Sequence, residues 1–325
     1  MKTSKYIRLL LSALGILGLV ACGGGGGGGG NVPPPQTLKY TGVTSPAVID
    51  SNNAVELASG AFIGGETGSN FGIISSVTAD QSKIVREIRL YKVAQIFSEP
   101  LYIIDINSHR GDSLAVQTEQ DTIQGDCGGS ASYTVQVDDV TGGFTGSMTF
   151  NGYCSEKATI TGITGFSGQV DINSGDFLNF NLDINMVSLS KGNQSYTIDG
   201  DLSVDVSGAT STASLEMKMR DNSGEVFWVN NYVLNISEAV DFVDIEASGK
   251  FYNPTYGYVV LSTITPLRTY NIYEWPSSGE LKIVGGEDTI ARLIAIDKNT
   301  CRIIADTNGD GNDDYDSGQV PWNDL

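Results

Sequence analysis

The chain of 325 residues contains little of what several common enzyme chemistries need. It has one histidine, His109, and four cysteines, and it shows no nucleotide-binding, kinase, zinc or hydrolase motif. No G-x-S-x-G turn accompanies the histidine, so a serine-hydrolase triad is not expected. Lys and Arg number 19 against 38 Asp and Glu, a formal net charge of −19. Because nucleic acid phosphates are bound through Lys and Arg, this charge argues against a nucleic acid partner and favours cations.

The N-terminus lacks an apolar run long enough to cross a bilayer. Residues 9–20 form a run of twelve, whereas a membrane-spanning helix needs about 20. The run follows a positively charged start, which is typical of a secretory signal. Cys22 comes next, followed by eight glycines and, shortly after, three prolines. Since glycine has no Cβ and samples most of backbone space, residues 23–36 predict a tether with an r.m.s. span of roughly 20 Å.

This N-terminus resembles that of bacterial lipoproteins. Residues 19–22 read L-V-A-C, which is similar to the lipobox of that family. The resemblance implies cleavage before Cys22, acylation of Cys22 and attachment to a lipid bilayer, because several acyl chains together anchor a protein stably. Gly rather than Asp at position 23 implies the outer membrane, on its periplasmic or cell-surface face. The domains expected are a signal peptide over 1–21, a lipidated Cys22 and Gly/Pro tether over 22–37, and a β-rich domain over 38–325.

Apolar and polar residues alternate over most of the chain from about residue 101. Such alternation predicts strands with one face in the core, the dry face, and one in water, the wet face. Residues expected on the dry face include Leu178, Phe180, Leu182, Ile184, Met186, Ile198, Leu202, Val204, Val206, Leu215, Met217, Met219, Ile290, Ile294 and Ile296. We expect a mainly β fold in which an antiparallel meander forms a curved sheet or a barrel. A β-sandwich is the alternative.

Two segments before the strands predict helices. Residues 51–60 read as a short helix that Asp50 or Ser51 caps and Gly60 ends. Residues 78–97 begin with a T-x-x-Q capping box and show a helical apolar stripe in their first half. We expect this longer helix to pack on the sheet.

The cysteines after Cys22 predict one disulfide, since an exported chain meets oxidising conditions. When residues 127–154 are folded as a hairpin about the D-V-T-G turn, Val137 faces Phe144 and Ala131 faces Phe150. The same register places Cys127 opposite Cys154 on the dry face. A slip by one residue would move one strand's apolar set into water, so we predict that these two cysteines are bonded. Cys301 is left as an inert, buried thiol.

The segment D-T-N-G-D-G-N-D-D near the C-terminus has the spacing of a calcium loop. The expected ligands are Asp306, Asn308, Asp310, the backbone carbonyl of Asn312, and Asp314, while Gly311 permits the sharp turn. The spacing resembles the D-x-D-x-D-G-x-x-D loops of integrin-like and thrombospondin-like calcium modules. It departs from an EF-hand at Ser317, where a bidentate Glu would stand. We expect a structural calcium site in a hairpin over residues 301–320; the alternative is a solvated acidic turn.

These observations favour a membrane-anchored envelope lipoprotein without enzymatic activity, similar to uncharacterised outer-membrane lipoproteins of Gram-negative bacteria. Its role would be structural or the binding of a protein or glycan. Aromatic residues that could form a binding surface are Tyr252, Tyr256, Tyr258, Tyr270, Tyr273 and Trp275. The alternative is a hydrolase that acts on envelope glycans through Asp or Glu, which would need two converging carboxyl groups.

Overall fold

The computed structural model describes residues 37–62 and 116–325, apart from residues 156, 173–176 and 193. Contacts divide the chain into Met1–Pro34 and Pro35–Leu325, and all described residues belong to the second unit. The expected signal peptide, Cys22, the tether, His109 and the predicted helix over 78–97 therefore lie outside the described residues. Among the described residues, no helix is long and apolar enough to span a membrane.

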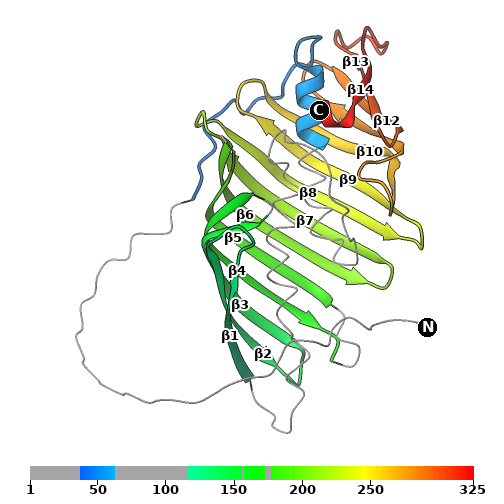
Figure 1. Ribbon diagram of the computed structural model, residues 1–325. Helices are drawn as coiled ribbons and strands as arrows, with labels where there is room; N and C mark the ends of the chain where they lie inside the picture. The colour runs from blue at the N-terminus through cyan, green and yellow to red at the C-terminus, as the bar shows by residue number, and fades with distance from the viewer. Residues whose placement is uncertain (1–36, 63–115, 156, 173–176, 193) are drawn as a thin grey trace, which may run out of the picture. The chain divides into compact units, whose positions relative to one another are not determined.

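In the part of the chain that the structure describes, fourteen strands form one antiparallel sheet in which each strand pairs only with its neighbours in sequence (Figure 1). The strands are β1 (Val116–Gln124), β2 (Ser130–Asp138), β3 (Gly143–Ser155), β4 (Ala158–Val170), β5 (Phe177–Lys191), β6 (Gln194–Ser207), β7 (Thr210–Arg220), β8 (Val226–Glu238), β9 (Phe242–Asn253), β10 (Gly257–Tyr270), β11 (Ser278–Val284), β12 (Ile290–Asp297), β13 (Thr300–Asp306) and β14 (Tyr315–Pro321). A short 3-10 helix, η1 (Trp322–Asp324), follows. The predicted antiparallel meander is confirmed. The sheet stays open, and the sandwich alternative is wrong because all strands belong to one sheet.

The two faces of the sheet differ as the alternation predicts. On β5, Phe180, Leu182 and Ile184 are buried, whereas Asn181 and Asp183 between them are exposed. The same alternation runs along β6 and β7. This periodicity keeps apolar side chains on one side of each strand, so a single contiguous core forms along the dry face.

The expected face of β12 is wrong. Ala291, Leu293 and Ala295 are buried there, and the isoleucines at 290, 294 and 296 lie on the opposite face. Apolar residues stand at both odd and even positions of this strand, so its own sequence does not determine which face is buried. Its neighbours do, because Leu293 pairs with Leu281 on β11 and with Ile303 on β13, both of which are buried.

A line of bulges crosses the middle of the sheet from β4 to β9, and we call it the crease. The ladders shift register between β4 and β5, between β5 and β6, between β7 and β8, and between β8 and β9, at adjoining positions each time. Met186 on β5 and Asn231 on β8 have positive φ there. Because a bulge bends its strand and increases the local twist, aligned bulges bend the whole sheet along one line.

Two glycines on the crease are required by close approach. A Cβ on Gly200 of β6 would lie 2.2 Å from the carbonyl oxygen of Glu216, and one on Gly249 of β9 would lie 2.3 Å from the ring of Tyr232. The crease also changes which residues face the core. After the bulge at Met186, Val187 and Leu189 take the buried positions on β5, so the expected dry-face position of Met186 is wrong.

The segment before the helix, residues 37–50, runs from β6 to the turn between β11 and β12, and we call it the strap. The backbone N–H of Leu38 donates to the carboxylate of Asp199 on β6 at 2.9 Å. Further along, the N–H of Ala47 donates to the carbonyl of Tyr258, and the N–H of Ile49 donates to the hydroxyl of Thr289. These bonds satisfy buried backbone groups of a segment that is not itself part of the meander.

A helix over residues 54–62 follows the strap and lies on the dry face (Figure 1). Asp50 caps it, as predicted, since its carboxylate accepts the N–H groups of Asn52 at 2.7 Å and Asn53 at 3.0 Å. Gly60 does not end the helix. It sits within it, at a point where a Cβ would lie 2.4 Å from the ring of Phe251. The hydroxyl of Tyr232 donates to the carbonyl of Ala61 at 2.9 Å and holds the same turn against β8.

Gly60→Ala tests this close approach. An alanine in a helix is normally more stable than a glycine by about 0.5–1 kcal/mol. Here we expect a loss of about 1–3 kcal/mol in the free energy of unfolding, because the added methyl group meets the buried ring of Phe251. Urea denaturation measures the loss. The double variant with Phe251→Leu should cost less than the sum of the two single variants, and a neutral or stabilising Gly60→Ala would contradict the packing.

Candidate functional site

The loop between β13 and β14 is built around the carboxylate of Asp306. One of its oxygens accepts the backbone N–H groups of Gly309 at 2.8 Å and Asp310 at 3.2 Å, and the other accepts that of Gly311 at 2.7 Å. Asp306 is 4% exposed. Gly309 and Gly311 have φ of +74° and +88°, so the turn depends on glycine at both positions. The predicted strands on either side of the loop are confirmed.

The other expected ligands line the same loop. Asp314 accepts the backbone N–H of Thr307 at 2.9 Å and the side-chain amide of Asn308 at 3.1 Å. The hydrogen bond from the Thr307 backbone holds the pKa of the Asp314 carboxyl below its usual value. Asp310 accepts the N–H of Asn312 at 2.8 Å. The five expected residues therefore share one exposed, hydrogen-bonded turn, although no group of three His, Cys, Asp or Glu is arranged to hold a metal within the described residues.

Two arginines stand beside the loop. Arg292 on β12 pairs with Asp313, and Arg302 on β13 pairs with Asp316. The Arg302 guanidinium lowers the pKa of the Asp316 carboxyl to about 2. Asp313 and Asp316, the two carboxylates that pair with the arginines, are thus not among the predicted ligands. The predicted ligands form hydrogen bonds within the loop instead.

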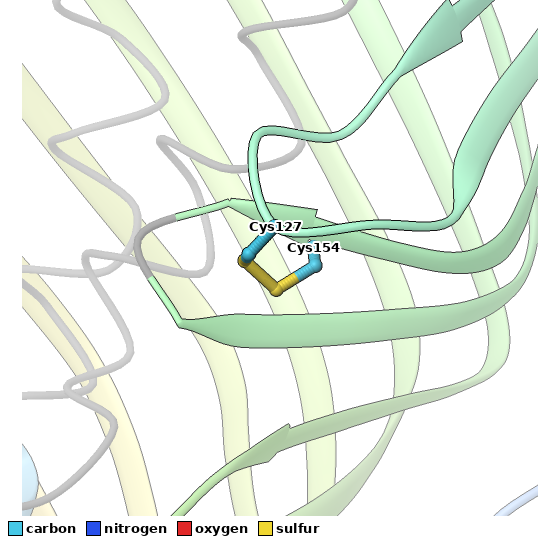
Figure 2. The surroundings of a disulfide bond; sticks show 2 residues. All are labelled: Cys127 and Cys154. Carbon is cyan, nitrogen blue, oxygen red and sulfur yellow. A yellow bond between two sulfur atoms is a disulfide. The ribbon is translucent and has the colours of Figure 1, made fainter.

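The predicted disulfide is present. Cys127 and Cys154 are bonded, with their Cα atoms 5.1 Å apart (Figure 2). The register of β2 and β3 is the predicted one, since Val137 pairs with Phe144 and Ala131 with Phe150. Cys301 is free and buried, and burial raises the pKa of its thiol to about 12. It is therefore a protonated core residue, as expected.

The expected face of the disulfide is wrong. Past Phe150, β3 contains a bulge at Gly152, which has φ of +61°, and the ladder with β4 slips by one residue there. The bulge turns Tyr153 into the core and Cys154 toward the wet face. Cys127 in the β1–β2 turn is exposed accordingly. The bridge therefore closes the hairpin from outside the core.

A trough of about 610 Å³ lies on the wet face along the crease. Its lining includes three carboxyl groups that stand directly opposite one another on consecutive strands, Asp183 on β5, Asp201 on β6 and Glu216 on β7. We call these three the acid row. Sequence reasoning missed it, because the three residues become neighbours only through the ladder register. Converging carboxyl groups are what the hydrolase alternative needs, and that alternative stays a prediction.

The aromatic residues singled out from the sequence fall into separate groups. Tyr252 and Tyr258 belong to a cross-strand stack on the wet face, in which Trp228 lies 4.4 Å from Tyr252 between ring centroids. Tyr40 of the strap packs on this stack at 5.5 Å from Tyr252. Trp275 is buried and stacks on Trp322. The first group therefore holds the strap, and sequence reasoning missed Tyr40 and Trp228 as its members.

Removal of the disulfide should destabilise the domain. For Cys127→Ser with Cys154→Ser, the entropy that the unfolded chain gains without the cross-link predicts a decrease in the free energy of unfolding of roughly 3.5 kcal/mol. Urea denaturation measures this decrease. Cys301→Ala, in which the disulfide is intact, is the control for the loss of a cysteine outside the bridge. Peptide mapping without reduction should recover the peptide that contains Cys127 joined by a disulfide to the peptide that contains Cys154. Recovery of Cys301 in a bridge would contradict the register.

Comparisons of the chain with protein-family models, with curated proteins and with solved structures found no match.

Proposed function

We propose that the protein is a lipid-anchored lipoprotein of the Gram-negative outer membrane, with a binding or structural role and no catalytic activity. The observation that carries the proposal is the L-V-A-C segment at residues 19–22, placed after a short apolar run and before a glycine tract. The strongly acidic composition keeps such a domain soluble at the membrane surface.

We further propose that the loop over Asp306–Asp314 binds calcium. Support comes from the number of oxygens that the loop gathers. Ca²⁺ takes about six to eight oxygen ligands, from carboxylates, amides, carbonyls and water. An ionised carboxylate has about four lone-pair sites, and Asp306 uses three of them for backbone N–H groups. The ordered turn thus retains acceptor capacity on the carboxylates of Asp306, Asp310 and Asp314.

Calcium here would be structural. The loop joins the last two strands of the meander, and Gly309 approaches the turn before β12 so closely that a Cβ would lie 2.5 Å from the carbonyl of Glu287. A cation that fixes the loop would therefore fix the end of the sheet. The exposed setting favours weak binding, with a dissociation constant of about 10⁻⁴–10⁻³ M as in extracellular modules.

Cys22→Ser tests the anchor. The variant keeps the signal's charge and apolar run but loses the thiol that the acyl chain needs. We expect it to leave the membrane fraction, while the parent stays there after a high-salt wash and carries label from a radioactive fatty acid. Cys301→Ser serves as the control for a general effect of cysteine loss. Equal retention of the Cys22→Ser variant would place the attachment elsewhere.

Asp310→Ala tests the calcium loop. Because a ligand of the folded state stabilises it by mass action, 10 mM Ca²⁺ should raise the thermal midpoint of the parent by about 3–10 °C over that in chelator. The shift should vanish in Asp310→Ala. Asp313→Ala removes the same charge from the same loop but not an expected ligand, so it should keep the shift. Equal midpoints for the parent with calcium and with chelator, without a calorimetric signal, would contradict the proposal.

A further inference from the structure

The acid row places three like charges in direct opposition across three strands. Asp201 on β6 pairs with Asp183 on β5 and with Glu216 on β7. Directly opposed residues have Cβ atoms about 4.5–5.5 Å apart, and like charges at that separation destabilise a sheet. The row adjoins the crease, because Gly200 precedes Asp201 and the register shift between β7 and β8 falls at Glu216. The repulsion therefore acts where the ladder is already interrupted.

Few charged groups offset this repulsion. Lys218 on β7 is a cation that acts on Asp201, and its ammonium group lies 5.3 Å from the ring centroid of Trp228. On β6 itself, Asp199 adds a further negative charge and is held by the backbone N–H of Leu38. Within the described residues, Asp183, Glu216, Asp199 and Lys218 are the charged groups that act on Asp201.

We propose that the acid row works as a proton-sensitive clasp on the crease. When Asp201 is protonated, its carboxyl group donates a hydrogen bond to the carboxylate of Asp183 or Glu216 and ties β6 to a neighbouring strand. When Asp201 is ionised, the row repels itself, and the strands open along the crease first.

The direction of the pH effect follows from the surroundings of Asp201. Partial burial in the trough raises the pKa of its carboxyl above the usual value of 3.8, and the charges of Asp183, Glu216 and Asp199 raise it further. The folded protein therefore binds this proton more tightly than the unfolded chain does. Its contribution favours folding below about pH 3.8 and turns into a penalty as the pH rises through the raised pKa.

Other carboxyl groups act in the opposite direction. Asp314 and Asp316 have lowered pKa values, so the stability that they contribute is present at neutral pH and is lost in acid. The pH profile of the parent alone thus mixes both effects. A variant of Asp201 measured against the parent at each pH cancels the contribution of every unchanged group and leaves that of the row.

Asp201→Asn tests the clasp in the full chain. Asparagine has the shape of the protonated side chain, carries no charge and still donates a hydrogen bond. At pH 7.5 we expect the variant's thermal midpoint to lie about 1–4 °C above that of the parent, because one like-charge opposition is removed on each side. As the pH falls through the raised pKa of Asp201, the difference should shrink toward zero, because the parent then carries the proton itself.

Asp205→Asn is the matched control. Asp205 lies on the same face of β6 but pairs with Asn179 and Thr212, so no carboxylate stands opposite it. Its substitution should not reproduce the pH-dependent gain. Amide hydrogen exchange, corrected for intrinsic rates, should also show that the crease residues of β5–β7 gain protection in the parent, and not in Asp201→Asn, as the pH is lowered from 7.5 through the raised pKa of Asp201. A variant without a gain at pH 7.5, a gain independent of pH, or equal protection in both proteins would overturn the proposal.

Discussion

The whole domain depends on one constraint, which is that every strand pairs only with its neighbours in sequence. Within the described residues no strand returns to the far end of the sheet, so each ladder is the only strand pairing between the parts on either side of it. A change of register at one ladder therefore sets which side chains meet across all that follows. The crease shows this directly, since the bulges on β5 and β8 bend the sheet, and the one on β5 places Asp183 opposite Asp201.

The strap and the helix after it add contacts to a sheet whose strands pair only in sequence order. Tyr40 packs on the aromatic stack of the wet face, while the helix lies against Phe251 and Tyr232 on the dry face. The same short segment thus holds β8–β10 from both sides. At the other end of the helix, Phe62 lies 5.1 Å from the ring of Trp322, which extends the contact to the residues after β14. Residues that are first in the folded unit therefore stabilise those that are last.

Much of the fold could be predicted because the alternation is strong and local. The pairing of β2 with β3, and with it the disulfide, follows from one requirement, that apolar residues of both strands share a face. The prediction failed at two bulges, where a single residue changed the buried face, and on one strand with apolar residues on both faces. Gly152 turned the disulfide toward water, Met186 moved the dry face to Val187, and β12 needed its neighbours to select a face. Bulges depend on strands that are distant in sequence, so their positions are not readable from one strand.

The candidate sites differ in the same way in how far they could be predicted from the sequence. The loop over Asp306–Asp314 is local, and its ligand spacing was visible in nine consecutive residues. The acid row was not, because Asp183 and Glu216 are joined only through Asp201 on the strand between them. The role of the aromatic stack was likewise not visible in the sequence, because the stack is the surface on which Tyr40 of the strap packs.

The central claim is that aligned register shifts form the crease, and cross-strand nuclear Overhauser contacts between β5 and β6 test it most directly. The structure places Ile184 opposite Gly200 and Val187 opposite Ile198, with one extra residue on β5 between the two pairs. Contacts that join Val187 to Ile198 while Ile184 still meets Gly200 are the predicted result. Contacts that join Val187 to Thr197 instead would show an uninterrupted ladder, and the crease would not exist at that point.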